Sequence, residues 1–249
     1  MDNRYMRTAG YGATGARSMA TDAGLRRYML GVYNYMASAV LLTGIVSLLV
    51  YSNDALSGLF YQMQAGRPVG MTGLGWIATL SPLAFILVLS FGINKLSAGA
   101  TQALFWTFAV LFGISMSSIF YTYTGQSIAQ VFFVTAIAFG GLSLYGYTTK
   151  RDLGPVGTFA IMGLIGIIIA SLVNIFVASS MMSFIISVAG VLIFAALTAY
   201  DTQRIRQTYD MVVGNAEMMK KASVMGALSL YLDFVNLFMM LLSLLGNRE

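Results

Sequence analysis

Two aspartates in apolar surroundings are the residues of this chain with the clearest capacity for chemistry. Asp233 lies in LSLYLDFVNLFMMLLSLLG (residues 228–246), which otherwise has the composition of a membrane-spanning helix. Asp201 lies in AALTAYDTQRIRQTY (residues 195–209), where an apolar run meets a charged segment. Two carboxylates buried a few Å apart cannot both ionise cheaply, so they would share a proton. Their oxygens would equally suit a hard cation such as Ca²⁺.

The amino-acid composition excludes most other kinds of site. The chain contains no cysteine and no histidine. Disulfides, thiolate nucleophiles, iron–sulfur clusters, imidazole acid–base chemistry and the usual zinc sites are therefore excluded. The net charge of +5 does not indicate nucleic-acid binding, because the basic residues lie between apolar runs and not along one helix.

The pattern around Asp233 predicts that this side chain points into the protein. One helix face carries residues spaced by three and four, five of the six small or polar: Gly226, Ser229, Asp233, Asn236, Met240 and Ser243. An ionised carboxylate in mid-membrane costs roughly 2.5–3.5 kcal/mol, so this face should pack against other helices. An intramembrane aspartate indicates a functional site, and the structural alternative is a hydrogen bond between helices.

Asp201 has plainer alternatives, as a solvated helix-end residue or as the partner of Arg204 at i+3. The short loop over residues 206–221 predicts that the last two helices are antiparallel neighbours. With similar offsets from that loop, the two aspartates would reach the same depth. We therefore expect Asp201 and Asp233 to form a proton-sensing and cation-binding pair, with calcium as the ion. Asn236, Ser229 and Arg204 are the expected supporting residues.

The apolar runs that hold these aspartates indicate an all-α integral membrane protein. Hydrophobic residues make up 58% of the 249 residues and charged residues only 9%, against about 25% charged in soluble domains. Mean hydropathy is +0.78. A spanning helix needs about 20 apolar residues, and the charge-free intervals predict seven spans. These intervals are 28–53, 68–94, 96–149 with a break at 122–127, 153–200 with a break near 178–183, and 222–247.

The distribution of lysine and arginine predicts the orientation in the membrane. Twelve of these residues fall on the side of the N-terminus, and only Arg67 and Arg248 fall on the other. We therefore expect a cytoplasmic N-terminus and an outer C-terminus. Residues 1–20, rich in Gly, Ala and polar residues, are expected to form a disordered cytoplasmic tail, and residues 21–249 a seven-helix domain.

Small residues in the predicted fourth span point to close helix packing. Gly140 and Gly141 are adjacent in that span. Small residues allow helix backbones to approach in a membrane, so we expect a close approach at this pair.

Four segments together resemble the Bax inhibitor-1 family, also called transmembrane Bax-inhibitor-motif proteins. They are RRYMLGVYNYMASAVLLTG (26–44), LSLYGYTTKRDL (142–153), AYDTQRIR (199–206) and LYLDFVNLF (230–238). The likeness extends in order and spacing over nearly all of residues 22–246. With short loops and neither cysteine nor histidine, the chain looks most like the prokaryotic branch.

The resemblance implies a multi-pass protein of the cell (inner) membrane whose seventh helix is surrounded by the other six. It also implies a pH-sensitive calcium leak controlled by two aspartates, which fall on Asp201 and Asp233. Some relatives pair these aspartates with an arginine in the second span. Residues 72–94 hold no basic residue here. Either Lys95 or Arg204 takes that place, or the closed form is held differently.

Two other functions remain open at this stage. Bacterial relatives are tied to the membrane protease that clears damaged membrane proteins, so a non-transporting regulator with a cytoplasmic binding tail is one alternative. An intramembrane aspartyl protease is another. Its second aspartate follows Gly-x-Gly, whereas Asp233 follows Leu-Tyr-Leu. We expect no enzyme activity and no cofactor, and as partners the lipid bilayer, calcium or other cations, and a membrane protease.

Overall fold

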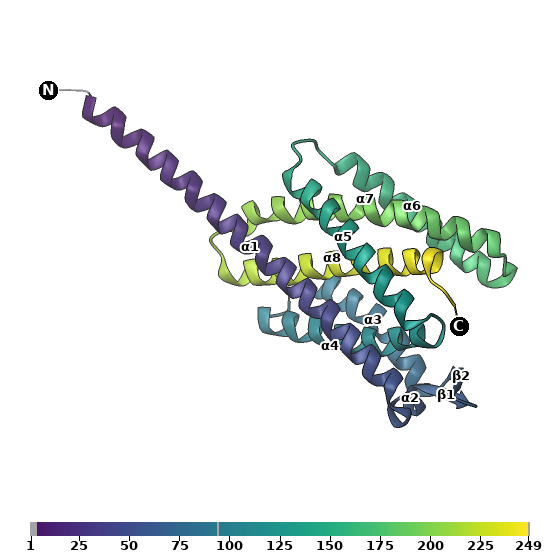
Figure 1. Ribbon diagram of the computed structural model, residues 1–249. Coiled ribbons are helices and arrows are strands. Elements are labelled where there is room, and N and C mark those ends of the chain that lie inside the picture. Colours follow the sequence, from purple (N-terminus) through teal and green to yellow (C-terminus); the bar gives the residue numbers. More distant parts are fainter. Residues whose placement is uncertain (1–3, 94, 249) are drawn as a thin grey trace.

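The computed structural model describes residues 4–93 and 95–248, with side chains from residue 23 onward (Figure 1). In chain order its elements are α1 (Arg4–Ser52), α2 (Asp54–Phe60), β1 (Tyr61–Gln64), β2 (Arg67–Met71), α3 (Gly73–Gly92), α4 (Ala98–Met116), the 3-10 helix η1 (Ser117–Tyr121), α5 (Gly125–Thr148), α6 (Gly154–Val177), α7 (Ser180–Val212) and α8 (Ala216–Leu245). The disordered tail expected over residues 1–20 lies in the part of the chain whose side chains are not described. It therefore stays a prediction.

The prediction of a seven-helix membrane protein is confirmed. Within the described residues, seven helices are long and apolar enough to span a membrane: Ala23–Ser52, Gly73–Gly92, Ala98–Tyr121, Gly125–Thr148, Gly154–Val177, Ser180–Val212 and Ala216–Leu245. The two breaks expected inside the long charge-free intervals lie where α5 and α7 begin. The apolar pattern alone was therefore enough to separate the spans.

A β-hairpin precedes the second span, where the sequence pattern predicted helix from residue 68. Strands β1 and β2 pair antiparallel around a two-residue turn. Both turn residues have positive φ, 51° at Ala65 and 78° at Gly66, as hairpin turns of type I′ require. Residues 68–71 therefore pair with β1, and α3 starts only after Thr72.

Local capping explains where most helices begin. Six helices start after a Ser, Thr or Asn whose side chain accepts a hydrogen bond from a backbone N–H in the first turn: Asn53, Thr72, Ser97, Thr124, Ser179 and Asn215. Such caps satisfy donors that have no partner within the helix. These capping residues lie in the short connections between helices, where placing a polar side chain costs the least free energy.

The last helix lies in the centre of the bundle, as the family resemblance implied. α8 packs against α1, α4, α5 and α7. Half of the residues in its most apolar window are buried, compared with 11–33% in the other six spans. Figure 1 shows α1 and α5 crossing α8, with α3 and α4 below it and α6 and α7 above it in the view. A side chain on α8 is thus screened from lipid on most faces.

A hydrogen-bonded tyrosine ties three helices together at this centre. Tyr231 of α8 is fully buried, and its ring lies edge-on to that of Phe108 with centroids 5.4 Å apart. Its hydroxyl lies 2.7 Å from Oγ1 of Thr43, which also donates to the carbonyl of Ala109 at 3.0 Å. A buried tyrosine hydroxyl needs such a partner, so the contact fixes α1, α4 and α8 relative to one another.

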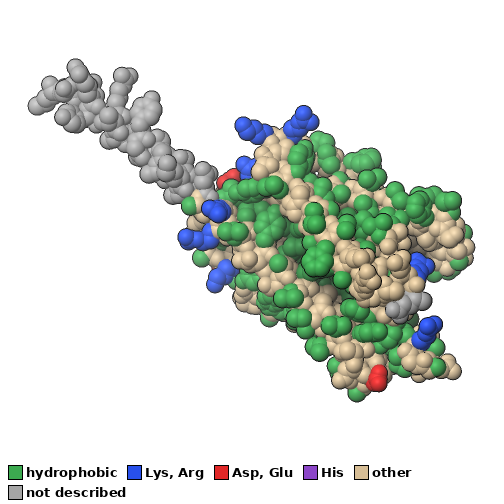
Figure 2. All heavy atoms as spheres, viewed as in Figure 1, with side chains coloured by type: hydrophobic (Ala, Val, Ile, Leu, Met, Phe, Trp, Pro, Cys, Tyr) green, Lys and Arg blue, Asp and Glu red, His purple; other side chains and the backbone are tan. Residues whose placement is uncertain are grey.

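Charged side chains gather at the ends of the bundle, and hydrophobic side chains cover its middle (Figure 2). We call the end that holds the α7–α8 turn and the C-terminal end of α5 the basic end. The described basic residues of these segments and of the start of the first span are Arg26, Arg27, Lys150, Arg151, Arg204, Arg206, Lys220 and Lys221. The predicted orientation places this end in the cytoplasm.

Close helix approach in the fourth span occurs at Gly146, and the expectation for Gly140 and Gly141 is wrong. A Cβ atom on Gly146 would lie 2.2 Å from the carbonyl oxygen of Ala199 on α7. A Cβ on Gly140 or Gly141 would meet nothing within 4 Å. The tight contact lies five residues after Gly141, about one and a half helical turns later. The sequence therefore predicted the right helix but the wrong residues.

We predict that Gly146→Ala destabilises the protein, whereas Gly141→Ala does not. The added methyl group must push α5 away from α7, and overpacking of this kind costs roughly 1–3 kcal/mol. Thermal unfolding of both variants in the same detergent would measure the difference. Equal unfolding temperatures would show that the α5–α7 contact is not tight.

The orientation can be tested with fusions to alkaline phosphatase, which is active only outside the cytoplasm. A fusion after residue 249 should be active, and an insertion at Gly214, in the α7–α8 turn, should be inactive. The reverse pattern would place the basic end outside the cell and contradict the positive-inside prediction.

Candidate functional site

The two aspartates lie on the α7–α8 hairpin, whose helices pack together over most of their length. α7 continues to Val212, so residues 206–212 of the expected loop belong to the helix. The turn between the helices is only residues 213–215, with Gly214 at φ +97° and Asn215 capping α8. The predicted antiparallel arrangement is therefore present, with a tighter turn than expected.

The register of this hairpin shows that the aspartates lie at different depths, which corrects the expectation of equal depth. A Cβ on Gly226 would lie 3.1 Å from the side chain of Ile205. Farther along, Oγ of Ser187 donates to Oγ of Ser243 at 3.0 Å. This register puts Asp201 opposite residues 229–230 of α8. Asp233 lies about one helical turn deeper, an axial offset of about 5–6 Å.

Asp201 lies on the wall of a polar cavity at the basic end. This cavity of about 200 Å³, which we call the polar cavity, lies between α1, α7 and α8 and is lined by Tyr28, Asp201, Arg204, Ile205, Thr208, Ala222, Met225, Gly226 and Ser229. The Asp201 side chain is 15% exposed, and one of its oxygens lies 3.9 Å from Nη1 of Arg204. Arg204 is 65% exposed, so this i,i+3 pair is weak and can open readily.

Asp233 is the buried member of the pair. The residue is 5% exposed, and its Oδ2 has no hydrogen-bond partner among the described residues. It follows Ser229, a wall residue of the polar cavity, by one helical turn on the same face. Asp233 itself therefore points inward as predicted, although most other residues of the predicted face are only half-buried and residues of the opposite faces, such as Leu237 and Phe238, are buried.

The predicted supporting residues are only partly brought together. Ser229 and Arg204 both line the polar cavity with Asp201. The side chain of Asn236 instead donates to the carbonyl of Leu232 in its own helix at 2.8 Å. Its amide group is therefore engaged with the α8 backbone, and Asn236 is not among the residues that line the cavity.

One cavity residue was missed by the sequence pattern. Tyr28 lines the polar cavity, is 4% exposed, and its hydroxyl has no hydrogen-bond partner among the described residues. Its ring packs on that of Tyr209 with centroids 5.6 Å apart. A tyrosine near the end of a span is typical of an interfacial anchor, so its position after Arg26 and Arg27 gave no signal that it enters the bundle.

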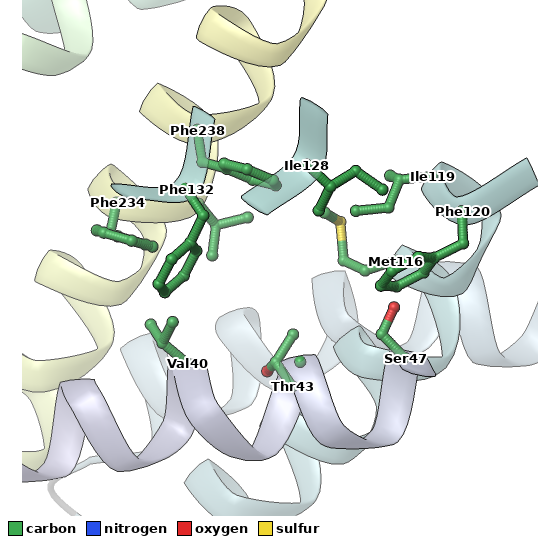
Figure 3. A pocket seen from close by; sticks show the side chains of 12 residues that line it. Val40, Thr43, Ser47, Met116, Ile119, Phe120, Ile128, Phe132, Phe234 and Phe238 are labelled. Atoms are coloured by element: carbon green, nitrogen blue, oxygen red, sulfur yellow. The ribbon is translucent and has the colours of Figure 1, made fainter. Parts of the chain in front are cut away.

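Beyond Asp233 the interior becomes apolar. The next buried residues of α8 pack in two hydrophobic clusters, Leu237 with Phe194 and Leu197, and Phe238 with Ile119. Beside them is a cavity of about 100 Å³ between α1, η1, α5 and α8, where side chains of α1 face Phe132, Phe234 and Phe238 (Figure 3). We call it the phenylalanine cavity. The polar cavity is therefore followed by an apolar zone.

The described residues contain no group of three or more Asp, Glu, His or Cys side chains able to hold a metal ion. Calcium takes six to eight oxygen ligands, and two carboxylates supply at most four. The arrangement thus offers a partial site, in which a cation would keep much of its water.

Comparison with known proteins agrees with this architecture. A family model described as inhibitor of apoptosis-promoting Bax1 matches residues 25–249. An uncharacterized protein of Caulobacter vibrioides is 47% identical over 232 residues, 93% of each chain. The inner membrane protein YbhL of Escherichia coli K12 is 44% identical over 228 residues, covering 91% of this chain and 94% of YbhL. These similarities confirm the resemblance found in the sequence and the prediction of a multi-pass inner membrane protein.

We predict that Asp233→Asn stabilises the protein at neutral and alkaline pH. An ionised buried carboxylate without a hydrogen-bond partner is costly, and the neutral amide should recover roughly 1–3 kcal/mol. The gain should shrink in acid, where the wild-type carboxyl group is protonated and carries no charge. Thermal unfolding in detergent with a calcium chelator, as a function of pH, would measure it.

Asp210→Asn is the matched control, because Asp210 is an exposed residue of α7 outside the polar cavity. It should change stability little at any pH. An Asp233→Asn variant less stable than wild type at alkaline pH would mean that the carboxylate has a stabilising partner.

Proposed function

The chain belongs to the Bax inhibitor-1 family, and we propose that it is a pH-sensitive leak for calcium and similar cations, gated by Asp201 and Asp233. One observation carries the proposal. A buried carboxylate with an unpaired oxygen lies one turn beyond a polar cavity whose wall bears a second carboxylate. An intramembrane acid in this setting marks an ion pathway more often than a structural contact.

A cation would enter this site from the basic end. The exposed Arg204 is the only positive group on the cavity wall among the residues whose side chains are described, and its pairing with Asp201 is weak. A divalent cation that displaces the guanidinium would gain the Asp201 carboxylate and retain water on its other sides. Ser229 and Tyr28 also line this cavity, and in the proposal their hydroxyl groups supply further oxygens.

Protonation would regulate this step. With both carboxylates ionised, the pair attracts cations and repels itself, so it is stable only when a cation is bound. A shared proton removes the repulsion and with it the attraction for calcium. Flux is therefore expected to increase with pH. Transport also requires an opening of the apolar packing around Leu237 and Phe238, which separates the pair from the outer end.

Arg204 is the proposed substitute for the second-span arginine of some relatives. α3, the second span, packs mainly on α4 and contributes no residue to the polar cavity. Arg204 contacts Asp201 directly. Both residues lie on α7, so this pair does not link two helices. We propose that Arg204 competes with a cation for the Asp201 carboxylate, and that the aspartates act in transport and not in catalysis.

Calcium flux into proteoliposomes tests the proposal. We expect wild-type flux to rise from about pH 5 to about pH 8, and Asp201→Asn or Asp233→Asn to reduce flux at the higher pH on the order of tenfold, equivalent to about 1.4 kcal/mol of lost attraction. Asp210→Asn, the exposed control on α7, should retain the wild-type rate and pH profile.

Flux that is independent of pH and unchanged in both cavity variants would reject the leak. Calcium flux that falls with rising pH, but is still lost in Asp233→Asn, would keep the site and reverse the proposed gating.

A further inference from the structure

A groove open to the bilayer runs between α1 and α5. It does not belong to the proposed transport site. Both helices pack on the central α8, but they are not among the helix pairs that pack on each other. Figure 1 shows them running alongside one another across α8. We call the resulting groove the α1–α5 seam.

Two hollows lie along this seam. The first, about 380 Å³ and nearer the basic end, is lined by Tyr33, Met36, Ala37, Phe139, Gly140, Ser143, Leu144 and Tyr147. The second is the phenylalanine cavity of Figure 3, to which α1 and α5 also contribute. Phe234 of α8 lies between the two, with its ring centroid 5.5 Å from those of Phe132 and Phe139. Together they form a nearly continuous apolar surface along the span.

Both helices are membrane spans over this stretch, so the molecules that face the seam are lipids. The first hollow is open at its rim, where Leu144 is 62% exposed and Gly140 presents bare backbone. A Cβ on Gly140 would meet nothing within 4 Å. The hollow therefore has room for an acyl chain, and glycine is what keeps that room free.

Positive charge lies at the mouth of the first hollow. Arg206 of α7 donates from Nη1 to the carbonyl of Tyr147 at 2.8 Å, and its guanidinium carbon lies 5.7 Å from the centre of the Tyr147 ring. Tyr147 is itself a wall residue of the hollow. Because a guanidinium has five N–H donors, Arg206 can still donate to an anion while it holds this carbonyl.

Two more basic residues follow α5 directly, Lys150 and Arg151. The acid in this segment, Asp152, accepts a hydrogen bond from the N–H of Gly154 at 2.9 Å and so is engaged at the start of α6. The mouth of the hollow thus combines an apolar groove with a net positive rim. Basic pockets between transmembrane helices are the arrangement that recognises anionic lipid headgroups.

We propose that the α1–α5 seam binds one anionic phospholipid from the leaflet at the basic end. An acyl chain lies in the first hollow and extends toward the phenylalanine cavity. The headgroup phosphate lies at Arg206, with Lys150 and Arg151 nearby. The lipid seals the gap that α1 and α5 leave over α8, a role independent of the aspartate pair.

Native mass spectrometry of the full chain purified in detergent tests this site, with phosphatidylglycerol and phosphatidylethanolamine of identical acyl chains as probes. Wild type should retain one phosphatidylglycerol and bind it about fivefold more tightly than phosphatidylethanolamine, the preference expected from one basic contact. Gly140→Leu fills the hollow and should lose binding of both lipids. Gly141→Leu, one residue away and outside the hollow, should bind like wild type.

The headgroup contact is tested separately. Arg206→Gln should remove the preference for phosphatidylglycerol while leaving chain binding, and Arg206→Lys should keep the preference. If Gly140→Leu fails to fold, Ala37→Phe fills the same hollow from α1. Wild-type binding in both filled variants would overturn the proposal, as would equal binding of the two lipids by wild type. A protein dimer that these substitutions dissociate would show that a second copy covers the seam.

Discussion

The burial of Asp233 is the constraint on which the rest of this structure depends. A carboxylate at mid-span is tolerated only where lipid cannot reach it. The bundle meets this requirement by surrounding α8 with α1, α4, α5 and α7, so that half of its apolar window is buried. The remaining spans are then free to expose hydrophobic side chains to lipid, and α6 does so along most of its length.

Burial keeps Asp233 away from lipid but provides no hydrogen-bond partner for its Oδ2 atom. Its Oδ2 remains unpaired among the described residues, while the neighbouring helix positions hold hydrogen-bonded groups such as Tyr231 with Thr43. The hydroxyl groups of that contact are thus paired, whereas Oδ2 of Asp233, like the hydroxyls of Tyr28 and Ser47, has no partner among the described residues. A buried carboxylate oxygen without a partner lowers the stability of the fold. A role in exchanging protons or cations would explain why the acid is present.

The polar and apolar halves of the interior follow from the same arrangement. α7 and α8 diverge little along their length, so space near Asp201 depends on small residues of α8, among them Gly226 and Ser229. Beyond Asp233, large side chains such as Phe238 and Leu242 fill the interior. The acids therefore have a cavity with polar wall residues on one side and apolar packing on the other. A transport cycle built on this interior would alternate access by repacking the apolar half.

The sequence by itself determined the number of spans and the inward direction of Asp233, because charge-free length and the cost of a charge in mid-membrane can be read from the residues alone. It also revealed the family through four ordered motifs. Only the tertiary structure decided the one-turn offset between Asp201 and Asp233, the entry of Tyr28 into the cavity, the close approach at Gly146 in place of Gly140, and the open seam beside α5. Each of these depends on how far one helix slides or rotates against another. These helix positions are set by packing between residues that are distant in the chain, and no local sequence pattern specifies them.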